Sequence, residues 1–148
     1  MQLSEHFQKE EFEKDGPMPE ECVGSYRSLC ESILEPIRLH IGQPLRITSG
    51  YRTPASNAVA GGVSSSQHCA TDRWCAADWW EPSTNMREVF DWIRLQSGLK
   101  FDQLILEHDG GNLCIIHTSW STTPRRMALE GATANRTGYI SWPVTGEK

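Results

Sequence analysis

The chain has no long apolar run and no block of positive charge. No window approaches the roughly 20 consecutive apolar residues that a membrane-spanning helix needs, so we expect no membrane insertion. The 148 residues include 14 lysines and arginines against 19 aspartates and glutamates, which gives a formal net charge of -5. This charge provides no basic surface for phosphate backbones, and we therefore expect no nucleic-acid partner.

The N-terminal segment lacks the apolar core of a secretory signal. Residues 1–16 read MQLSEHFQKEEFEKDG, which is acidic and polar, whereas a signal peptide has a basic start and an apolar stretch. The five cysteines are an odd number, which argues against a secreted disulfide framework. We expect synthesis in the cytoplasm without a signal peptide, with Cys22 and Cys30 as small buried apolar residues.

No repeat or low-complexity segment divides the chain, so residues 1–148 are expected to form one domain and a monomer. Apolar residues follow helical spacing from Pro19 to Ile41, with Pro36 expected to kink this helix or start a second one. Another helix is expected within residues 85–98. Strands are expected at 44–48, 103–108 and 113–120, with weaker ones at 125–129 and 137–142. This pattern predicts an α+β fold with a small antiparallel sheet and flanking helices.

Residues 64–80, SSSQHCATDRWCAADWW, concentrate polar and reactive side chains. A buried strand or helix rarely carries so many polar atoms, because each needs a partner once it leaves water. Three interpretations are open. The segment is a surface loop without a role, a structural zinc clip through His68, Cys69 and Cys75, or part of a catalytic metal site through His68 and an aspartate.

His117 lies in the otherwise apolar run LCIIHTSW, where a buried histidine is costly unless its ring nitrogens are occupied. A satisfied core histidine is one explanation. A catalytic zinc is the other, because it commonly takes three ligands from histidines and carboxylates and keeps a fourth position for water. His68, Asp78 and His117 could supply such a set, with Asp72 as the alternative carboxylate.

The two late strands are joined by DGGN, a strong hairpin signal. With a DGG turn, Gln103 lies opposite His117, and strand alternation puts Gln103, Glu107 and His117 on one face. Glu107 would then lie beside the metal as a base. A four-residue turn would send it to the other face, and Asp109 in the turn is the alternative.

Several motifs in order resemble peptidase family M15, the zinc D-Ala-D-Ala carboxypeptidases, especially its short phage and bacterial members. They are ITSGYRTPASNAVAGGVSSSQH, CAADWW, FDQLILE and IIHTSW, and with the N-terminal segment the resemblance covers nearly the whole chain. It implies a hedgehog/DD-peptidase-like fold and a Zn²⁺ ion held by His68, Asp78 and His117. It also implies that Arg52 of SGYR contacts the substrate and steadies the developing oxyanion.

The resemblance makes Glu107 the best match for the general base, although other branches of the family carry the acid at the position of Cys114. The family usually spaces its first histidine and aspartate as H-x-x-G-x-A-x-D. Here the spacing is three residues longer, with Trp74 in place of the glycine. The local AAD pattern favours Asp78 over Asp72 as the ligand.

The inserted residues add two open questions. Cys69 and Cys75 flank the insertion, and they are candidates for a disulfide after release from the cell or for soft zinc ligands. Three tryptophans, Trp74, Trp79 and Trp80, either line a substrate groove or pack in the core.

These features together predict a zinc-dependent peptidase that hydrolyses peptide bonds in peptidoglycan stem peptides or cross-links. A carboxypeptidase and an endopeptidase fit equally. We expect a phage lysis enzyme that acts on the cell wall after release. The alternative is a non-catalytic metal-binding module of the same fold, such as a phage structural or binding protein.

Overall fold

A six-stranded sheet forms the centre of the molecule in the computed structural model, which describes residues 1–59, 66–110, 113–132 and 138–145. The strand order is β1-β2-β4-β3-β5-β6. The strands are β1 (Arg46–Ser49), β2 (Trp74–Trp80), β3 (Gln103–His108), β4 (Cys114–Ser121), β5 (Met127–Ala132) and β6 (Ile140–Trp142). The predicted α+β class is confirmed, and β1 and the four late strands lie at or within a few residues of their expected positions.

One pair of strands departs from the expected antiparallel sheet. β5 pairs with β3 in parallel, whereas the other four pairings are antiparallel. The reason is local. β4 runs antiparallel to β3 and ends beside the start of β3. The short connection 122–126 then starts β5 at that same end, so β5 runs in the same direction as β3. The backbone N–H of Met127 donates to the carbonyl of Asp102, which fixes this start at 2.9 Å.

The long N-terminal helix is interrupted as expected. α1 (Glu20–Leu29) continues through a π-helical turn, η2 (Cys30–Leu34), into α2 (Glu35–Ile41). Pro36 lies in the first turn of α2, where its missing N–H costs least. The prediction that Pro36 starts a second helix is therefore confirmed. Gly42 ends α2 in the left-handed region with φ of 77°.

Three further helical segments complete the fold. They are the 3₁₀ turn η1 (Lys9–Phe12), α3 (Pro54–Val59) and α4 (Met86–Leu95). α4 begins at Asn85, whose side chain accepts a hydrogen bond from the backbone N–H of Glu88. α3 was not predicted, because SGYRTP was interpreted only as a turn. Thr53 caps α3 by accepting the N–H of Ser56 at 3.0 Å, which is an ordinary N-cap contact.

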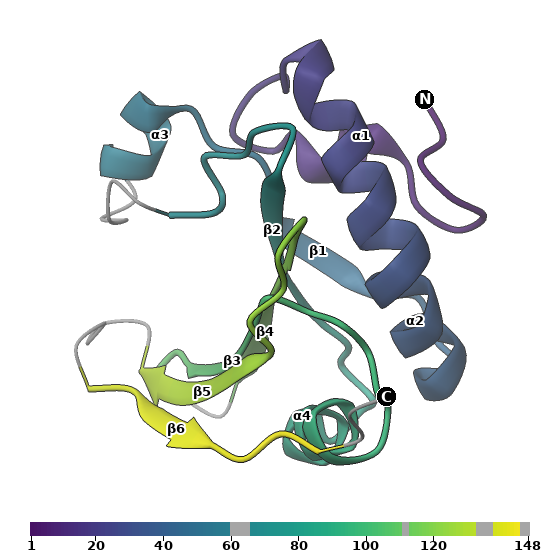
Figure 1. The fold of residues 1–148 in the computed structure, drawn as a ribbon, viewed down its shortest axis with the longest axis vertical. Helices are drawn as coiled ribbons and strands as arrows, with labels where there is room; N and C mark the ends of the chain where they lie inside the picture. The colour runs from purple at the N-terminus through teal and green to yellow at the C-terminus, as the bar shows by residue number, and fades with distance from the viewer. Residues whose placement is uncertain (60–65, 111–112, 133–137, 146–148) are drawn as a thin grey trace.

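The hydrophobic core lies on one face of the sheet. Helices α1, α2 and α4 lie on that side, with the other side left to α3 and the loops (Figure 1). Tyr26 of α1 is fully buried and donates to the carbonyl of Ala76 at 2.8 Å. Cys22 and Cys30 are buried in this core, which confirms their prediction. In the described residues no helix has the length and apolarity to cross a membrane.

Strand β2 is the element that the sequence analysis missed. Residues 74–80 belong to a stretch interpreted there as a polar segment, yet they form a strand between β1 and β4. Cys75, Ala77 and Trp79 are buried on the helix-covered face, and Asp78 projects from the other. The polar character of the stretch is concentrated before the strand, at residues 64–73.

Candidate metal centre

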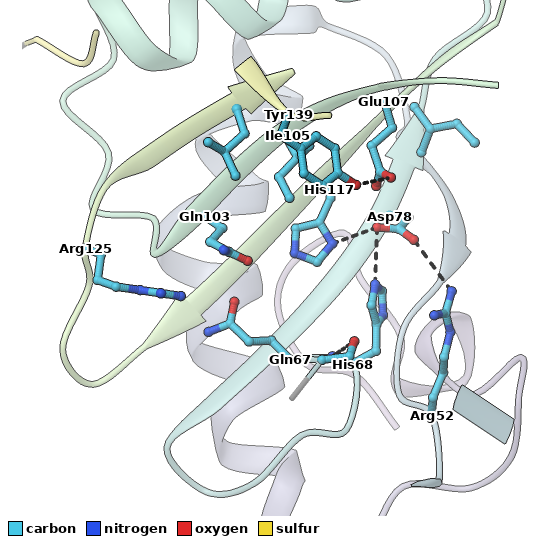
Figure 2. A pocket seen from close by; sticks show the side chains of 13 residues that line it. Arg52, Gln67, His68, Asp78, Gln103, Ile105, Glu107, His117, Arg125 and Tyr139 are labelled. Atoms are coloured by element: carbon cyan, nitrogen blue, oxygen red, sulfur yellow. Dashed lines mark hydrogen bonds and ion pairs between the residues drawn. The ribbon is translucent and has the colours of Figure 1, made fainter. Parts of the chain in front are cut away.

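His68, Asp78 and His117 converge on the open face of the sheet (Figure 2). One potential ligand atom from each lies within 4.8 Å of the others. His117 on β4 is the direct register partner of Asp78 on β2, and His68 lies in the turn that precedes β2. Asp78 Oδ1 is 3.3 Å from Nε2 of His68 and 3.0 Å from Nδ1 of His117.

The hydrogen bonding of His68 shows that this cluster suits a cation. Nδ1 of His68 lies 2.6 Å from the carbonyl oxygen of Gly50. A carbonyl only accepts, so Nδ1 carries the hydrogen, and Nε2 is the ring nitrogen that faces Asp78 and is placed to bind a metal ion. Nδ1 of His117 approaches the same carboxylate oxygen. Two histidine nitrogens therefore lie beside one carboxylate oxygen, and a backbone carbonyl orients one of the two rings. Metal sites commonly combine such ligands with an outer hydrogen-bond acceptor.

The ionisation of Asp78 also favours a bound cation. Burial would raise the pKa of Asp78, but the charges and hydrogen bonds of His68 and His117 outweigh it and hold that pKa well below its usual range. Burial would lower the pKa of His117, whereas its hydrogen bond to Asp78 and the nearby carboxylates raise it. Asp78 therefore stays anionic at neutral pH, ready to bind a positive ion.

The backbone around Gly50 positions His68. A Cβ at Gly50 would lie 2.5 Å from the carbonyl oxygen of Phe12, so only glycine fits there. The N–H of Tyr51 donates to that same carbonyl at 2.8 Å, and the N–H of Arg52 donates to the carbonyl of His68 at 2.8 Å. The SGYR motif thus holds His68 by its ring and by its backbone.

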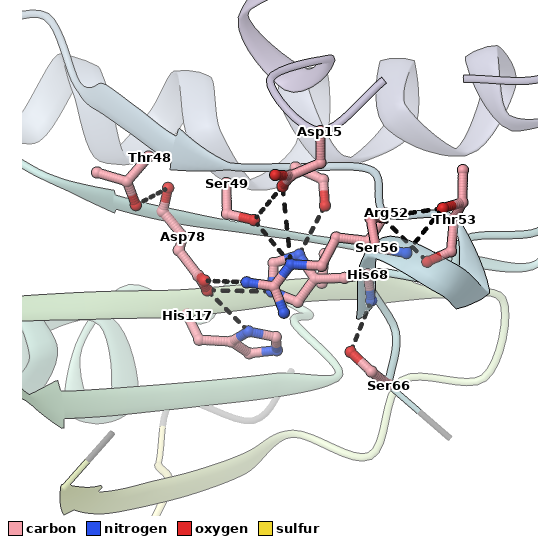
Figure 3. Close-up of polar contacts among 12 residues, drawn as sticks. Asp15, Thr48, Ser49, Arg52, Thr53, Ser56, Ser66, His68, Asp78 and His117 are labelled. Atoms are coloured by element: carbon pink, nitrogen blue, oxygen red, sulfur yellow. Dashed lines mark hydrogen bonds and ion pairs between the residues drawn. The ribbon is translucent and has the colours of Figure 1, made fainter. Parts of the chain in front are cut away.

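The guanidinium of Arg52 lies beside the carboxylate of Asp78 (Figure 3). Its Nη2 is 3.9 Å from Asp78 Oδ2, and its Nε donates to Oγ of Ser49 at 3.2 Å. Asp15 lies 3.8 Å from the same Nε. The guanidinium therefore pairs with Oδ2 of Asp78, whereas both histidines approach Oδ1.

A cavity of about 470 Å³ opens over the cluster. The five residues predicted as metal ligands or catalytic groups all line it, namely Arg52, His68, Asp78, Glu107 and His117. The lining also includes residues that the sequence analysis did not single out, among them Gln67, Arg125 and Tyr139. Substrate-sized molecules are commonly bound in cavities of this size.

Glu107 lies on the same face as His117, but the expected hairpin register is wrong. Ile105, not Gln103, pairs with His117, and Glu107 pairs with Ile115. The connection from β3 to β4 spans residues 109–113 instead of a three-residue turn. Because the register differs by an even number of residues, the side chains keep the predicted face.

Two alternative carboxylates lie away from the cluster. Asp72 and Asp109 are exposed and do not line the cavity, whereas Glu107 is buried and does. Cys114 does not line the cavity either, and its thiol contacts His108 on the reverse face of the hairpin. The position where other branches carry an acid is thus turned away from the cluster here.

No cysteine belongs to a possible metal group in the described residues. Cys69 and Cys75 are free thiols, and Cys75 is fully buried in β2. The structural clip through His68, Cys69 and Cys75 therefore does not form.

None of the three tryptophans lines the cavity, which corrects the proposed substrate groove. Trp79 is fully buried and donates to Oγ1 of Thr118 at 2.9 Å. Trp80 packs partly buried under Arg46, and Trp74 is exposed. Alternation along β2 puts Trp79 on the core face, opposite to Asp78, so core packing is the correct interpretation for that residue.

The longer spacing between His68 and Asp78 is accommodated by a closed turn. The N–H of Thr71 donates to the carbonyl of Trp74 at 3.0 Å, and the indole N–H of Trp74 donates to the carbonyl of Cys69 at 3.2 Å. The hydroxyl of Ser25 on α1 donates to the carbonyl of Thr71 at 2.8 Å. The inserted residues therefore turn back on themselves, and the strand then presents Asp78 to His68.

A buried aspartate organises the far end of the cavity. Asp102 accepts from Nε2 of Gln67 at 2.6 Å and from two nitrogens of the Arg125 side chain at 2.7 and 3.0 Å. Burial would raise the pKa of Asp102, but Arg125 and Gln67 outweigh it and lower that pKa. The sequence contained one indication of the role of Asp102. It is the acid of FDQ, directly before a buried strand, and an acid in that position needs a partner.

Tyr139 is the other residue that sequence reasoning missed. Its hydroxyl donates to Oε2 of Glu107 at 3.3 Å. A Cβ on Gly131 would overlap the Tyr139 ring, so this glycine makes room for the tyrosine beside Glu107. The segment TGYISW was interpreted only as a weak strand, and no pattern in it indicated a contact with β3.

An α+β fold with a His/Asp/His cluster that lines a cavity defines a candidate metal-dependent enzyme. The family model described as Peptidase M15 matches residues 5–111, and the chain belongs to this family. Membership supports a metallopeptidase. A search of curated proteins found no match. The matched range includes His68, Asp78 and Glu107, while His117 lies beyond it and is placed by its pairing with Asp78.

Proposed function

We propose that this chain is a zinc peptidase that hydrolyses peptide bonds in peptidoglycan stem peptides or cross-links. The observation that carries the proposal is the approach of two histidine nitrogens to one oxygen of the partly buried Asp78 carboxylate, beneath a cavity that Glu107 also lines. Nitrogen and oxygen ligands in a set of three are typical of catalytic zinc. His68, Asp78 and His117 would hold the ion through Nε2, a carboxylate oxygen and Nδ1.

The residues around the cluster have separate roles in this proposal. When bound, zinc would supply Lewis acidity and a water of lowered pKa. Glu107 accepts the proton of the attacking water and returns it to the leaving amine, which is general acid–base work. Its face, its burial and its position in the same cavity favour it over Asp109. Tyr139 holds one carboxylate oxygen of Glu107 in place.

Arg52 has two tasks in the proposed reaction. Its contact with Asp78 Oδ2 fixes the orientation of that carboxylate. Its guanidinium also lines the cavity, where a positive charge stabilises the oxyanion that develops on the scissile carbonyl. Fixed donors of this kind contribute about 3 to 4 kcal/mol to transition-state stabilisation.

The phage lysis role belongs to the same proposal. A peptidoglycan peptide is a small substrate that a cavity of this size can hold, and the net charge of -5 is compatible with a partner other than nucleic acid. A phage lysis enzyme made in the cytoplasm would act on the wall after release. A monomer suffices, since all five proposed residues come from one chain.

Metal content and wall digestion should be measured on the same protein samples. Wild type should contain about one zinc per chain and release new amine ends from purified peptidoglycan. Glu107→Gln should keep the zinc and lose at least about a hundredfold in turnover. Asp109→Asn is the matched control, because its carboxylate is exposed on the same hairpin and should leave both readings unchanged.

The same samples separate an enzyme from a non-catalytic module. A zinc-loaded wild type that digests no peptidoglycan, and whose wall binding is unaffected by Glu107→Gln, would identify a binding module of the same fold. Assay of free amino acid release against cleavage within cross-links then distinguishes a carboxypeptidase from an endopeptidase.

A further inference from the structure

The hairpin of β3 and β4 carries a second group of reactive side chains on its reverse face. His108 and Cys114 are direct register partners. Because side chains alternate along a strand, this pair lies on the side opposite to Glu107 and His117. It therefore lies at the edge of the core beside α4, separated from the metal cluster by the sheet.

The side chains of Cys114, His108 and Glu130 lie in a row that suits proton transfer. Sγ of Cys114 is 3.4 Å from Nδ1 of His108, and Nε2 of the same ring is 2.7 Å from Oε2 of Glu130. A carboxylate only accepts, so Nε2 carries the hydrogen and Nδ1 presents its lone pair to the thiol. A nucleophile, a base and an acid that orients the base are the elements of an activated thiol.

Glu130 is held firmly in its orienting position. The parallel pairing of β5 with β3 puts it beside Leu106, on the same face as His108. It accepts from the indole N–H of Trp142 at 3.0 Å and forms an ion pair with Arg87 of α4. Burial would raise the pKa of Glu130, but its hydrogen bonds to His108, Arg87 and Trp142 outweigh it and lower that pKa. The acid therefore stays ionised and accepting at neutral pH.

The thiol is accessible from a cleft of about 480 Å³ at the start of α4. Cys114 and Arg87 both line this cleft, together with Trp80 and Met86. Arg87, which pairs with Glu130, therefore brings a guanidinium to the same cleft as Cys114. Glu81 also lines this cleft. A small molecule with a carboxylate fits such a site, because guanidinium groups pair readily with carboxylates.

The other thiols of the chain provide a comparison. Cys22, Cys30 and Cys75 are buried in the core. Cys69 is partly exposed, as Cys114 is, but no histidine contacts its sulfur in the part of the chain that the structure describes. Accessibility alone would make Cys69 and Cys114 similar, so a difference in reactivity would come from His108 and Glu130.

We propose that Cys114 is a reactive thiol that exchanges with small disulfides bearing a carboxylate, with His108 as its base and Arg87 as the carboxylate partner. The thiol proton passes to His108 Nδ1 as the sulfur attacks one sulfur of the disulfide. The S–S bond of the small molecule breaks, a new S–S bond forms at Cys114, and the other half leaves as a thiolate. Cys114 is oxidised and the leaving half is reduced, so the disulfide itself is the oxidant.

A base is needed because of the environment of the thiol. Burial raises the pKa of Cys114, and the charge of Arg87 only partly opposes that rise, with Glu130 and Asp109 adding to it. The free thiolate is therefore scarce at neutral pH, and the thiolate is the nucleophile. Removal of the proton by His108 during attack avoids this limitation. Arg87 also faces the negative charge that develops on the leaving sulfur.

The test uses the full chain and oxidised glutathione, with modification of each cysteine followed over time by peptide mass spectrometry. In wild type, Cys114 should react about tenfold or more faster than Cys69. His108→Gln should reduce the rate at Cys114 to that of Cys69 and leave Cys69 unchanged. Arg87→Gln should reduce the preference of Cys114 for oxidised glutathione over the uncharged 2-hydroxyethyl disulfide.

The outcomes are distinguishable from a purely structural cluster. If His108, Glu130 and Arg87 only join α4 to the sheet, His108→Gln would lower the melting temperature without changing the ratio of the two rates. Equal wild-type rates at Cys114 and Cys69, within about twofold, would overturn the proposal without any variant. An unchanged disulfide preference in Arg87→Gln would refute the carboxylate part.

Discussion

The ring of His68 donates a hydrogen bond from Nδ1 to the backbone carbonyl of Gly50 at 2.6 Å. This contact determines which nitrogen of His68 faces Asp78. It also connects the geometry of the metal cluster to a glycine that packs against the backbone of Phe12.

Gly50→Ala should weaken both folding and metal binding. The added methyl would lie 2.5 to 2.7 Å from three atoms of Phe12, so we expect a loss of about 1 to 3 kcal/mol in the free energy of unfolding. Displacement of the Gly50 carbonyl should also lower the zinc affinity, measured by competition with a chelating dye.

Gly24→Ala is the control for that experiment. Gly24 lies inside α1, and a Cβ added there would meet no neighbouring atom within 4 Å outside the helix backbone. Alanine there should stabilise the protein by about 0.5 to 1 kcal/mol. Zinc affinity should be unchanged. Equal effects of the two substitutions on zinc affinity would contradict the role given to Gly50.

Metal removal should lower the thermal stability of the protein. A ligand that binds only the folded state stabilises it by about 2.7 kcal/mol when its concentration is 100 times its Kd. We therefore expect zinc to raise the melting temperature in differential scanning calorimetry, and a chelator to reverse the rise. His68→Ala should lose this response, whereas Asp72→Asn, an exposed site outside the cluster, should keep it. A zinc response that survives His68→Ala would show that the ion binds elsewhere.

Tyr139→Phe should reduce turnover while metal content stays the same. The substitution removes only the hydroxyl that donates to Glu107 at 3.3 Å. A single hydrogen bond of this kind contributes about 0.5 to 1.5 kcal/mol, so the expected loss in kcat is up to about tenfold. Steady-state kinetics on a soluble peptidoglycan peptide would measure it. A kcat in Tyr139→Phe equal to that of wild type would contradict this role.

Acid should destabilise the protein partly through Asp102. Its folded-state pKa lies below its ordinary value of 3.8, so the unfolded chain binds the proton more readily. The stabilisation is fully present above the unfolded pKa and is lost as the pH falls through the folded pKa. Wild type should therefore exceed Asp102→Asn in stability at pH 7, and the difference should shrink below about pH 4. Urea unfolding at both pH values measures this, and a gap that is constant with pH would contradict the assignment.

The sequence predicted the elements that have strong local patterns. Apolar spacing and Pro36 predicted the N-terminal helices, and the runs QLILEH and LCIIHTSW predicted β3 and β4 almost to the residue. Strand alternation then put Glu107 and His117 on one face, although the turn length was wrong. That prediction survived because the face depends only on whether the register shift is even.

Other features depend on contacts that no local pattern records. β2 was missed because its tryptophans and alanines follow a polar turn, and its strand form depends on pairing with β1 and β4. The parallel position of β5 and the contact of Tyr139 with Glu107 arise from the path of the chain after β4. Gln67 and Arg125 are far apart in the sequence, yet both bind Asp102.

The pairing of Asp78 with His117 joins residues that are 39 positions apart. The strand that carries His117, β4, lies between β2 and β3 in the sheet. Until β4 is in place, β2 and β3 therefore each lack a strand partner on that side. Such long-range pairings form late, after the entropy of closing the intervening loop has been lost. During synthesis the N-terminal helices can therefore assemble first, and the chain becomes able to capture its ion only after β4 has left the ribosome.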